Sequence, residues 1–280
     1  MSADKRQVGP PCLTEYDVAR EQRLIFGEIA ELYDRSRPSY PDALVDDLVQ
    51  LAELRGDRPV LEIGAGTGKA TVAFASRGIP VLALEPSEAM AAYARRNCAE
   101  YPGVRIELTD FERWHPAGEW FPLLYSAQAW HWIAPEVRYK RAREALADGG
   151  ILAVFWNRPR WDGVELRPAL TEVYARTAPS ADTDGPMHPT NPEGPEQRED
   201  WAGEIELAEG LDQAEVRNYP WVREYSAAEY TDLLGTLSDH RLLPDRSRCA
   251  LLDAVSAAIE SGGGKLRMPF VTRLCLARAV

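Results

Sequence analysis

Three alternate glycines form the stretch of this sequence that is best suited to binding a cofactor. Gly64, Gly66 and Gly68 lie between an apolar segment that ends at Ile63 and a helical segment. Glycine adopts positive φ at low cost, and without a Cβ it allows a ligand to lie against the backbone. A dinucleotide site would need a glycine at position 69, where this chain has Lys69. The spacing therefore argues against a dinucleotide.

Two acids flank this turn and indicate the charge of the ligand. Glu62 lies in the apolar segment before the glycines, and Glu85 ends the next apolar segment. A carboxylate that points into such a site repels a pyrophosphate, but it suits a ligand that carries an ammonium and a sulfonium group. Glu62 and the spacing of the glycines together favour a cationic cofactor.

A histidine between two tryptophans is the second group that could do chemistry. His131 lies between Trp130 and Trp132, at the predicted carboxyl end of a strand, where open α/β sheets place their ligands. The ordinary pKa of an imidazole is near neutrality, so His131 could take a proton from a substrate. Alternatively, it could cap a helix or position neighbouring groups. The residues alone leave both roles open.

Alternating apolar and helical segments position these groups and predict a doubly wound sheet. The predicted strands are 60–63, 81–84, 104–108, 123–126 and 151–156, and the helices between them are 69–77, 88–100 and 135–146. Alternation of this kind produces a parallel sheet with helices on both faces. Residues 17–55 are predicted to form two helices, the first with an apolar face of Leu24, Ile25, Ile29 and Leu32.

The second half of the sequence departs from this alternation. A helix over 164–176 precedes residues 177–200, whose prolines, glycines and acids predict a mobile surface loop or lid. A strand over 214–226, helices over 226–243 and 247–261, and a final strand over 269–280 follow. Two strands joined by helices at this end predict an antiparallel addition to the sheet edge.

Several segments together resemble the class I S-adenosylmethionine-dependent methyltransferases. LEIGAGTGKAT resembles the first motif of that family, VLALEPSEAM its second strand, LTDFERW the segment after its third strand, LLYSAQAWHWI its fourth strand and LADGGILAVFWNRP its fifth strand. YDRSRPSYP and TLSDHRLLP are similar to a narrower subgroup of small-molecule enzymes close to trans-aconitate methyltransferase. One departure is Pro122, where the family usually has an acid that is mainly structural.

The resemblance implies roles for particular residues. Glu85 would bind both ribose hydroxyls, Asp110 the adenine amino group, and the backbone of Phe111 the adenine ring. Tyr33 and Arg37 would cover the cofactor near its methionyl end. The implied cofactor contacts are Glu62, Gly64, Gly66, Gly68, Glu85, Pro86, Met90, Asp110, Phe111, Gln128 and Arg37. The expected catalytic residues are His131 and Tyr33, and the expected acceptor contacts are Trp130, Trp132, Trp156 and Asn157.

The same resemblance implies the architecture of the chain. The expected fold is α/β: a doubly wound, Rossmann-like and mostly parallel seven-stranded sheet with an antiparallel C-terminal edge and a helical cap insertion. Four parts are expected, namely N-terminal helices or a lid at 1–55, a cofactor-binding core at 56–160, the helical cap with the proline-rich loop at 161–212, and the rest of the sheet with cap helices at 213–280.

Composition narrows the class of protein further. A formal charge of −12 disfavours a nucleic-acid partner, because phosphate binding needs a basic surface. No apolar run reaches membrane-spanning length and the first residues lack the apolar centre of a signal peptide, so we expect no membrane partner and a cytoplasmic location. Cys12, Cys98, Cys249 and Cys275 lack metal-ligand spacing. We therefore expect buried, reduced thiols and no metal.

The expected activity is methyl transfer from S-adenosylmethionine to a small organic acceptor. The tryptophans favour an aromatic or heterocyclic acceptor, methylated at nitrogen, carbon or oxygen in secondary metabolism. The subgroup resemblance instead suggests a polycarboxylate methylated at a carboxyl group. A nicotinamide-dependent oxidoreductase, a cofactor-binding protein without turnover, and a protein or RNA methyltransferase are the remaining alternatives.

Overall fold

The computed structural model describes residues 29–181, 183, 185, 187–191 and 200–280. Most of the first predicted helix, including Leu24 and Ile25, lies outside these residues. The described part of that region forms α2 (Ala30–Ser36), and the second predicted helix is α3 (Asp42–Leu51).

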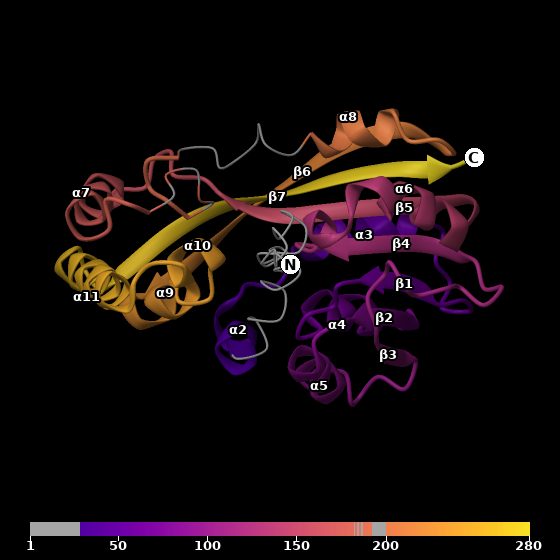
Figure 1. Cartoon of the computed structure of the whole chain (residues 1–280), viewed down its shortest axis with the longest axis horizontal. Helices are drawn as coiled ribbons and strands as arrows, with labels where there is room; N and C mark the ends of the chain where they lie inside the picture. Colours follow the sequence, from indigo (N-terminus) through magenta and orange to yellow (C-terminus); the bar gives the residue numbers. More distant parts are fainter. Residues whose placement is uncertain (1–28, 182, 184, 186, 192–199) are drawn as a thin grey trace, which may run out of the picture.

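A single seven-stranded sheet forms the centre of the described structure, in the order β3-β2-β1-β4-β5-β7-β6 (Figure 1). Its strands are β1 (Val60–Ile63), β2 (Val81–Glu85), β3 (Val104–Leu108), β4 (Phe121–Ala127), β5 (Leu146–Pro159), β6 (Leu211–Ser226) and β7 (Lys265–Ala279). β7 pairs antiparallel with both of its neighbours, whereas every other pair is parallel. The predicted fold class is confirmed. The reversed strand is next to the edge, and the edge strand β6 runs in the common direction.

Helices cover both faces of the sheet, and β1 and β2 are apolar apart from Glu62 and Glu85. Every residue of β1 and β2 is buried, as expected for parallel strands between two helical layers. On one face, α3 and α4 (Lys69–Ala75) pack against the sheet through Leu48 and Phe74. On the other, α6 (Pro135–Ala145) contributes Ala142. Successive strand residues alternate between these faces.

A second core forms at one end of the long strands β6 and β7 (Figure 1). There α7 (Arg167–Thr177), α9 (Ala227–Leu234), α10 (Ser238–Arg241) and α11 (Asp245–Ser261) make a helical cap. α9 begins with a capping box in which Ser226 and Glu229 satisfy each other's backbone N–H groups. The N-terminal helix is tied to this cap, because the Arg35 guanidinium donates to Asp232 at 2.9 Å.

Several elements differ from the sequence prediction. The helix expected over 226–243 is two helices, α9 and α10, and β5 and β7 begin earlier than predicted. Two elements were missed: the 3-10 helix η2 (Trp130–Trp132), and α8 (Trp201–Glu206). α8 is short and begins where the Asp200 carboxylate accepts the Gly203 N–H at 3.0 Å. A six-residue helix has too few turns for its apolar period to be recognised.

The proline-rich stretch also differs from a simple surface loop. Met187 and His188 are buried, and His188 packs edge-on against Tyr174 with ring centroids 4.6 Å apart. Ala178 and Met187 of this stretch therefore belong to the cap core. Among all described residues, no helix has the length and hydropathy needed to span a membrane.

Candidate functional site

A cavity of about 370 Å³ opens at the carboxyl ends of the parallel strands. Thirteen of the residues predicted from sequence lie along its wall. They are Tyr33, Arg37, Gly64, Gly66, Glu85, Pro86, Met90, Asp110, Phe111, Gln128, His131, Trp132 and Trp156. Open α/β sheets place their ligands at this edge because the strand order reverses there, which leaves a crevice between β1 and β4.

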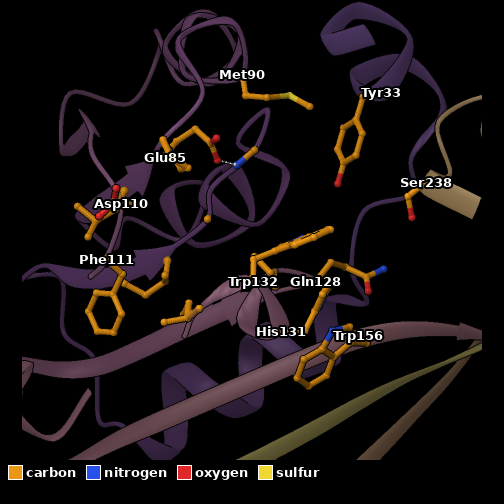
Figure 2. A pocket seen from close by; sticks show the side chains of 18 of the residues that line it. Tyr33, Glu85, Met90, Asp110, Phe111, Gln128, His131, Trp132, Trp156 and Ser238 are labelled. Atoms are coloured by element: carbon orange, nitrogen blue, oxygen red, sulfur yellow. Dashed lines mark hydrogen bonds between the residues drawn. The ribbon is translucent and has the colours of Figure 1, made fainter. Parts of the chain in front are cut away.

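The Glu85 carboxylate is oriented by backbone N–H groups at one end of the cavity. Gly66 N donates to Oε2 at 2.8 Å and Ser87 N donates to Oε1 at 2.9 Å. Figure 2 shows the first of these bonds, with Glu85 and Asp110 on one side of the cavity and Tyr33, Gln128 and Ser238 on the other. These two bonds fix the orientation of the carboxylate, whose oxygens are acceptors of the kind that a ribose diol needs.

The glycines of the turn serve different purposes. Gly66 has φ +57° and a Cβ there would meet nothing closer than a Tyr33 ring atom at 4.0 Å, so its backbone faces the open cavity. A Cβ on Gly64 would lie 2.4 Å from the Ala129 Cβ, which the packing of the two turns does not allow. Gly68 does not line the cavity: it precedes α4, and a Cβ there would press on Ala94 at 3.2 Å.

Asp110 and Phe111 lie beside Glu85, after β3. The Asp110 carboxylate accepts the Arg113 N–H at 3.0 Å, so it also stabilises its own turn. Phe111 is buried, and its ring lies between those of Trp114 and Trp130 at 6.4 and 6.5 Å. The segment was expected to contact an adenine ring, and its place next to the Glu85 carboxylate is compatible with that.

Residues from the N-terminal helix and the β4 turn form the opposite end. The Arg37 guanidinium donates to Thr236 Oγ1 at 2.8 Å and to the Thr236 carbonyl at 2.9 Å, and it lies 5.0 Å from the Tyr33 ring centroid. Gln128 has φ +62°, an uncommon conformation for a residue with a side chain. Its N–H donates to the Phe155 carbonyl at 2.9 Å, which holds this turn against β5.

Aromatic side chains form the wall nearest to β4 and β5. The exposed His131 ring packs on Trp132 at 4.6 Å. Trp156 stacks on Trp201 of α8, with ring centroids 5.2 Å apart and planes 6° from parallel. The missed helix α8 therefore holds one wall of the cavity. Arg158, two residues after Trp156 on the same face of β5, also lines it.

Glu62 does not line the main cavity, and its contact with the cofactor stays a prediction. Strand alternation places its side chain on the face covered by α3 and α4, where Thr71 donates to Oε2 at 2.5 Å and Tyr125 OH donates to the same atom at 3.0 Å. It lines a small cavity under the glycine turn instead of the main one. Burial raises the pKa of Glu62 to about 7, although the two hydroxyl hydrogen bonds lower it and nearby Glu85 raises it further.

Trp130 and Asn157 do not reach the cavity either. Trp130 is fully buried between Phe111 and Tyr139. Asn157 follows Trp156, so it points to the opposite face of β5, where its amide donates to the Ser39 carbonyl and accepts from Thr272 Oγ1 at 2.6 Å. Both residues support the fold next to the site.

The sequence interpretation missed residues that the cap contributes. Leu237 before α10, Ser238 and Asp239 at the start of α10 (together the α9–α10 turn), and Gly185 from the proline-rich stretch line the cavity. The sequence analysis matched TLSDHRLLP to the methyltransferase subgroup but gave its residues no role, because folding brings this segment to the glycine turn across the sheet end. Arg158 could have been found, since a strand side chain two residues after a wall residue shares its face.

The chemistry of the wall fits a cationic nucleoside. Glu85, Asp110, Glu112 and Asp239 line the cavity, against the two guanidinium groups of Arg37 and Arg158. A pyrophosphate would meet this excess of carboxylates, and Lys69 is turned away, since its Nζ donates to the Asp34 carbonyl at 2.6 Å. The open backbone of Gly66 beside Glu85 suits a ribose, and a sulfonium is compatible with the negative wall.

Comparisons with known proteins agree with this geometry. Residues 60–150 match the family model of a methyltransferase domain. The uncharacterized methyltransferase Rv3342 of Mycobacterium tuberculosis is 35% identical over 138 residues, which are 49% of this chain and 54% of that protein. The ribosomal RNA small subunit methyltransferase A of Thermotoga neapolitana is 36% identical over 70 residues, which are 25% of this chain and 27% of that protein. The chain spans about half the length of the first curated relatives it matches.

The solved structures extend the likeness over most of the chain. A protein of Anaeromyxobacter dehalogenans, assigned provisionally to the type II methyltransferases, has a TM-score of 0.60 and 20% sequence identity, and the alignment covers 86% of this chain and 97% of that one. The strand order and the cavity define a Rossmann-like cofactor-binding fold of the methyltransferase type. Residues 60–150 thus match a methyltransferase domain, and the chain is similar to the class I S-adenosylmethionine-dependent methyltransferases, whose cofactor is S-adenosylmethionine. Its placement in the trans-aconitate methyltransferase subgroup stays a prediction.

Proposed function

We infer that this protein transfers the methyl group of S-adenosylmethionine to a small aromatic or heterocyclic molecule, at nitrogen, carbon or oxygen. One observation carries this inference: a single cavity joins the oriented carboxylate of Glu85 at one end to a wall of Trp132 and Trp156 at the other. The end at Glu85 suits a nucleoside, and the aromatic wall suits a flat acceptor.

The residues present can hold the cofactor in one orientation. Glu85 would accept from the ribose hydroxyls, Asp110 and Phe111 would meet the adenine, and Tyr33 and Arg37 would cover the methionyl end. The bound cofactor supplies a methyl group already activated by its sulfonium. The protein therefore has to align the acceptor, exclude water and, for an acceptor that loses a proton, provide a base.

His131 and Tyr33 are the candidates for acceptor chemistry. Both line the cavity, and His131 is next to Trp132 in the 3-10 helix that ends β4. If His131 is the base, His131→Ala should reduce the methylation rate on the order of a hundredfold with unchanged cofactor affinity, and the acidic limb of the pH–rate profile should disappear. A smaller loss with an unchanged profile would assign His131 a positioning role.

The competing activities are disfavoured by the composition of the wall. A polycarboxylate acceptor would need cationic partners, and the two guanidinium groups of the wall face four carboxylates, with Arg37 already bound to Thr236. A nicotinamide dinucleotide would need the glycine that Lys69 replaces. For RNA, the formal charge of −12 opposes binding to a polyanion.

Two measurements test this function. In the first, calorimetry compares S-adenosylmethionine with NAD; binding of NAD alone would exclude methyl transfer. In the second, release of S-adenosylhomocysteine is followed with a panel of aromatic amines, indoles, phenols, polycarboxylates and structured RNA. Turnover confined to polycarboxylates or to RNA would contradict the aromatic acceptor. Cofactor binding with no turnover of any member would favour a binding protein.

A further inference from the structure

A chain of three hydrogen-bonded side chains runs from the cap core to the cavity. The Tyr174 hydroxyl of α7 lies 2.6 Å from Nε2 of His240 in α10, and Nδ1 of the same imidazole lies 2.8 Å from Oδ1 of Asp239. Tyr174 and His240 are each 2% exposed, whereas Asp239 lines the cavity. This arrangement connects the interior of the cap to one carboxylate of the wall.

The protonation states of Tyr174 and Asp239 follow from their surroundings, and the imidazole of His240 lies between them. Burial, and the nearby Asp239 charge, raise the pKa of Tyr174 well above its ordinary value, so its hydroxyl keeps its proton and donates to His240 Nε2. Nδ1 lies 2.8 Å from the Asp239 carboxylate, which can only accept, so Nδ1 is the donor of that bond. Burial alone would raise the pKa of Asp239, but the hydrogen bonds from His240 outweigh it and leave that pKa below its ordinary value. Asp239 is therefore an anion held in a fixed orientation.

Among the described residues, hydrogen bonds reach one of the two Asp239 oxygens. Oδ1 accepts from both the backbone N–H and the imidazole of His240, each at 2.8 Å. Across the described ranges, no residue donates to Oδ2, and no lysine or arginine pairs with Asp239. The nearby Arg37 guanidinium is bound to Thr236. Asp239 thus lines the cavity as a carboxylate whose Oδ2 has no donor among the described residues.

The position of this turn separates it from the nucleoside end. Ser238, which precedes Asp239, lies across the cavity from Glu85 and Asp110, on the side of Tyr33 and Gln128 (Figure 2). Trp132 and Trp156 line the same cavity and can attract a cation through their ring faces. The formal charge of −12 also raises the local concentration of cations.

We propose that Asp239 anchors the methyl acceptor and that this acceptor is an aromatic molecule carrying a protonated amino group. The aromatic part packs against the tryptophans, and the ammonium donates to Asp239 Oδ2. His240 and Tyr174 act as positioning residues, because they fix the carboxylate without touching the acceptor. This assignment deepens the methyl-transfer function proposed above and rests on it.

The test uses binding to the complex with S-adenosylhomocysteine, so it does not depend on knowing which atom is methylated. Calorimetry on the full chain saturated with this product compares three indoles that differ in one group: tryptamine, tryptophol and indole-3-propionic acid. We expect tryptamine to bind most tightly and the acid least tightly. Asp239→Asn should weaken the binding of tryptamine roughly ten- to a hundredfold. The affinity for tryptophol should stay within about threefold of the wild-type value.

Two further variants separate anchoring from general damage to the cap. Tyr174→Phe removes the hydroxyl that contacts His240, so the imidazole no longer fixes Asp239, and the ratio of tryptamine affinity to tryptophol affinity should fall. A merely structural defect would lower the two affinities alike. Asp245→Asn removes an exposed carboxylate of α11 that pairs with Arg248 at 2.7 Å, and it should change neither affinity.

Each remaining outcome overturns a particular statement. If S-adenosylhomocysteine binds but no indole does, or if tryptophol or the acid binds as well as tryptamine, the amine site is wrong and the methyltransferase function stands. If Asp239→Asn weakens S-adenosylhomocysteine itself more than about threefold, Asp239 contacts the cofactor instead of the acceptor. Failure of the wild-type protein to bind S-adenosylhomocysteine would remove the proposed function and, with it, the anchor.

Discussion

At the residue scale, Glu62 is the acid whose ionisation the fold changes most clearly. Its carboxyl is buried under the glycine turn with hydroxyl partners from Thr71 and Tyr125 and with no lysine or arginine paired to it among the described residues. Hydroxyl hydrogen bonds stabilise the carboxylate less than a paired cation would, so burial prevails and the pKa rises from 4.5 to about 7.

This raised pKa predicts a pH-dependent stability. The folded state holds the Glu62 proton more tightly than the unfolded state does. The stabilisation that Glu62 contributes is therefore fully present below pH 4.5, and it is lost as the pH rises toward about 7. The loss is on the order of 3 kcal/mol in the free energy of unfolding. Glu62→Gln keeps an acceptor for both hydroxyls and should flatten this decline. Denaturant unfolding of the wild-type protein and of Glu62→Gln from pH 4.5 to 7.5 measures this decline. Parallel curves of the free energy of unfolding against pH would contradict the prediction.

Glu85 carries the second prediction at this scale. Glu85→Ala should weaken S-adenosylmethionine binding by roughly 1.5–3 kcal/mol, the scale of losing charge-assisted hydrogen bonds to the ribose. The same change also releases Gly66 N and Ser87 N, so part of the loss comes from a less ordered turn. Glu88→Ala is the matched control, since Glu88 is exposed and pairs only with Arg95 at 3.3 Å. Equal affinities for the Ala variants by calorimetry would show that the ribose assignment is wrong.

At the scale of the element, the turn between β1 and α4 needs a glycine at position 66 for two reasons. Positive φ disfavours any side chain at Gly66, and the open space beside that residue faces the cavity. These two effects can be separated because Gly78 also has positive φ, at +75°, with nothing within 4 Å of a Cβ built there.

Substitution at the two glycines should therefore give different results. Gly66→Val and Gly78→Val both place a branched side chain at positive φ, so both should lower stability by roughly 1–3 kcal/mol. Only Gly66→Val should abolish S-adenosylmethionine binding, because its side chain enters the cofactor space. Thermal unfolding and calorimetry on each folded variant measure the two effects. Full binding by Gly66→Val would mean that the cofactor does not lie against this backbone.

At the scale of the whole molecule, the cavity joins two cores that have separate interiors. The sheet provides Glu85, Gly66 and the β4 turn, and the cap provides Leu237 to Asp239. α2 links them a second time, through Arg37 and Thr236. A ligand that fills the cavity should therefore stabilise both cores.

Hydrogen exchange can measure this coupling. S-adenosylhomocysteine at a hundred times its dissociation constant should raise the free energy of unfolding by about 2.7 kcal/mol. It should slow exchange in the glycine turn and also in the α9–α10 turn. NAD at the same concentration is the control and should change neither. Protection limited to the glycine turn would show that cofactor binding does not reach the cap.

Local chemistry in the sequence was sufficient to predict the parallel half of the sheet and to select Gly66, Glu85 and Asp110, which line one cavity. Apolar segments of strand length alternate with helical ones there, and Gly66, Glu85 and Asp110 each lie at the end of a strand or in the turn after it. Their positions follow from the general rule that parallel strands end at one edge. Class membership was predictable for the same reason, since the motif segments are contiguous in the chain.

Only the tertiary structure decided which face each side chain uses and which distant residues complete the wall. Glu62 and Asn157 point away from the cavity, because neighbouring residues on a strand alternate between faces that the sequence does not label as site or support. Asp239 reaches the cavity because packing of the cap brings the α9–α10 turn to the sheet end, and its negative charge is stabilised by His240. Such contacts form between segments far apart in the chain, so their geometry depends on the whole folded core and not on any local pattern.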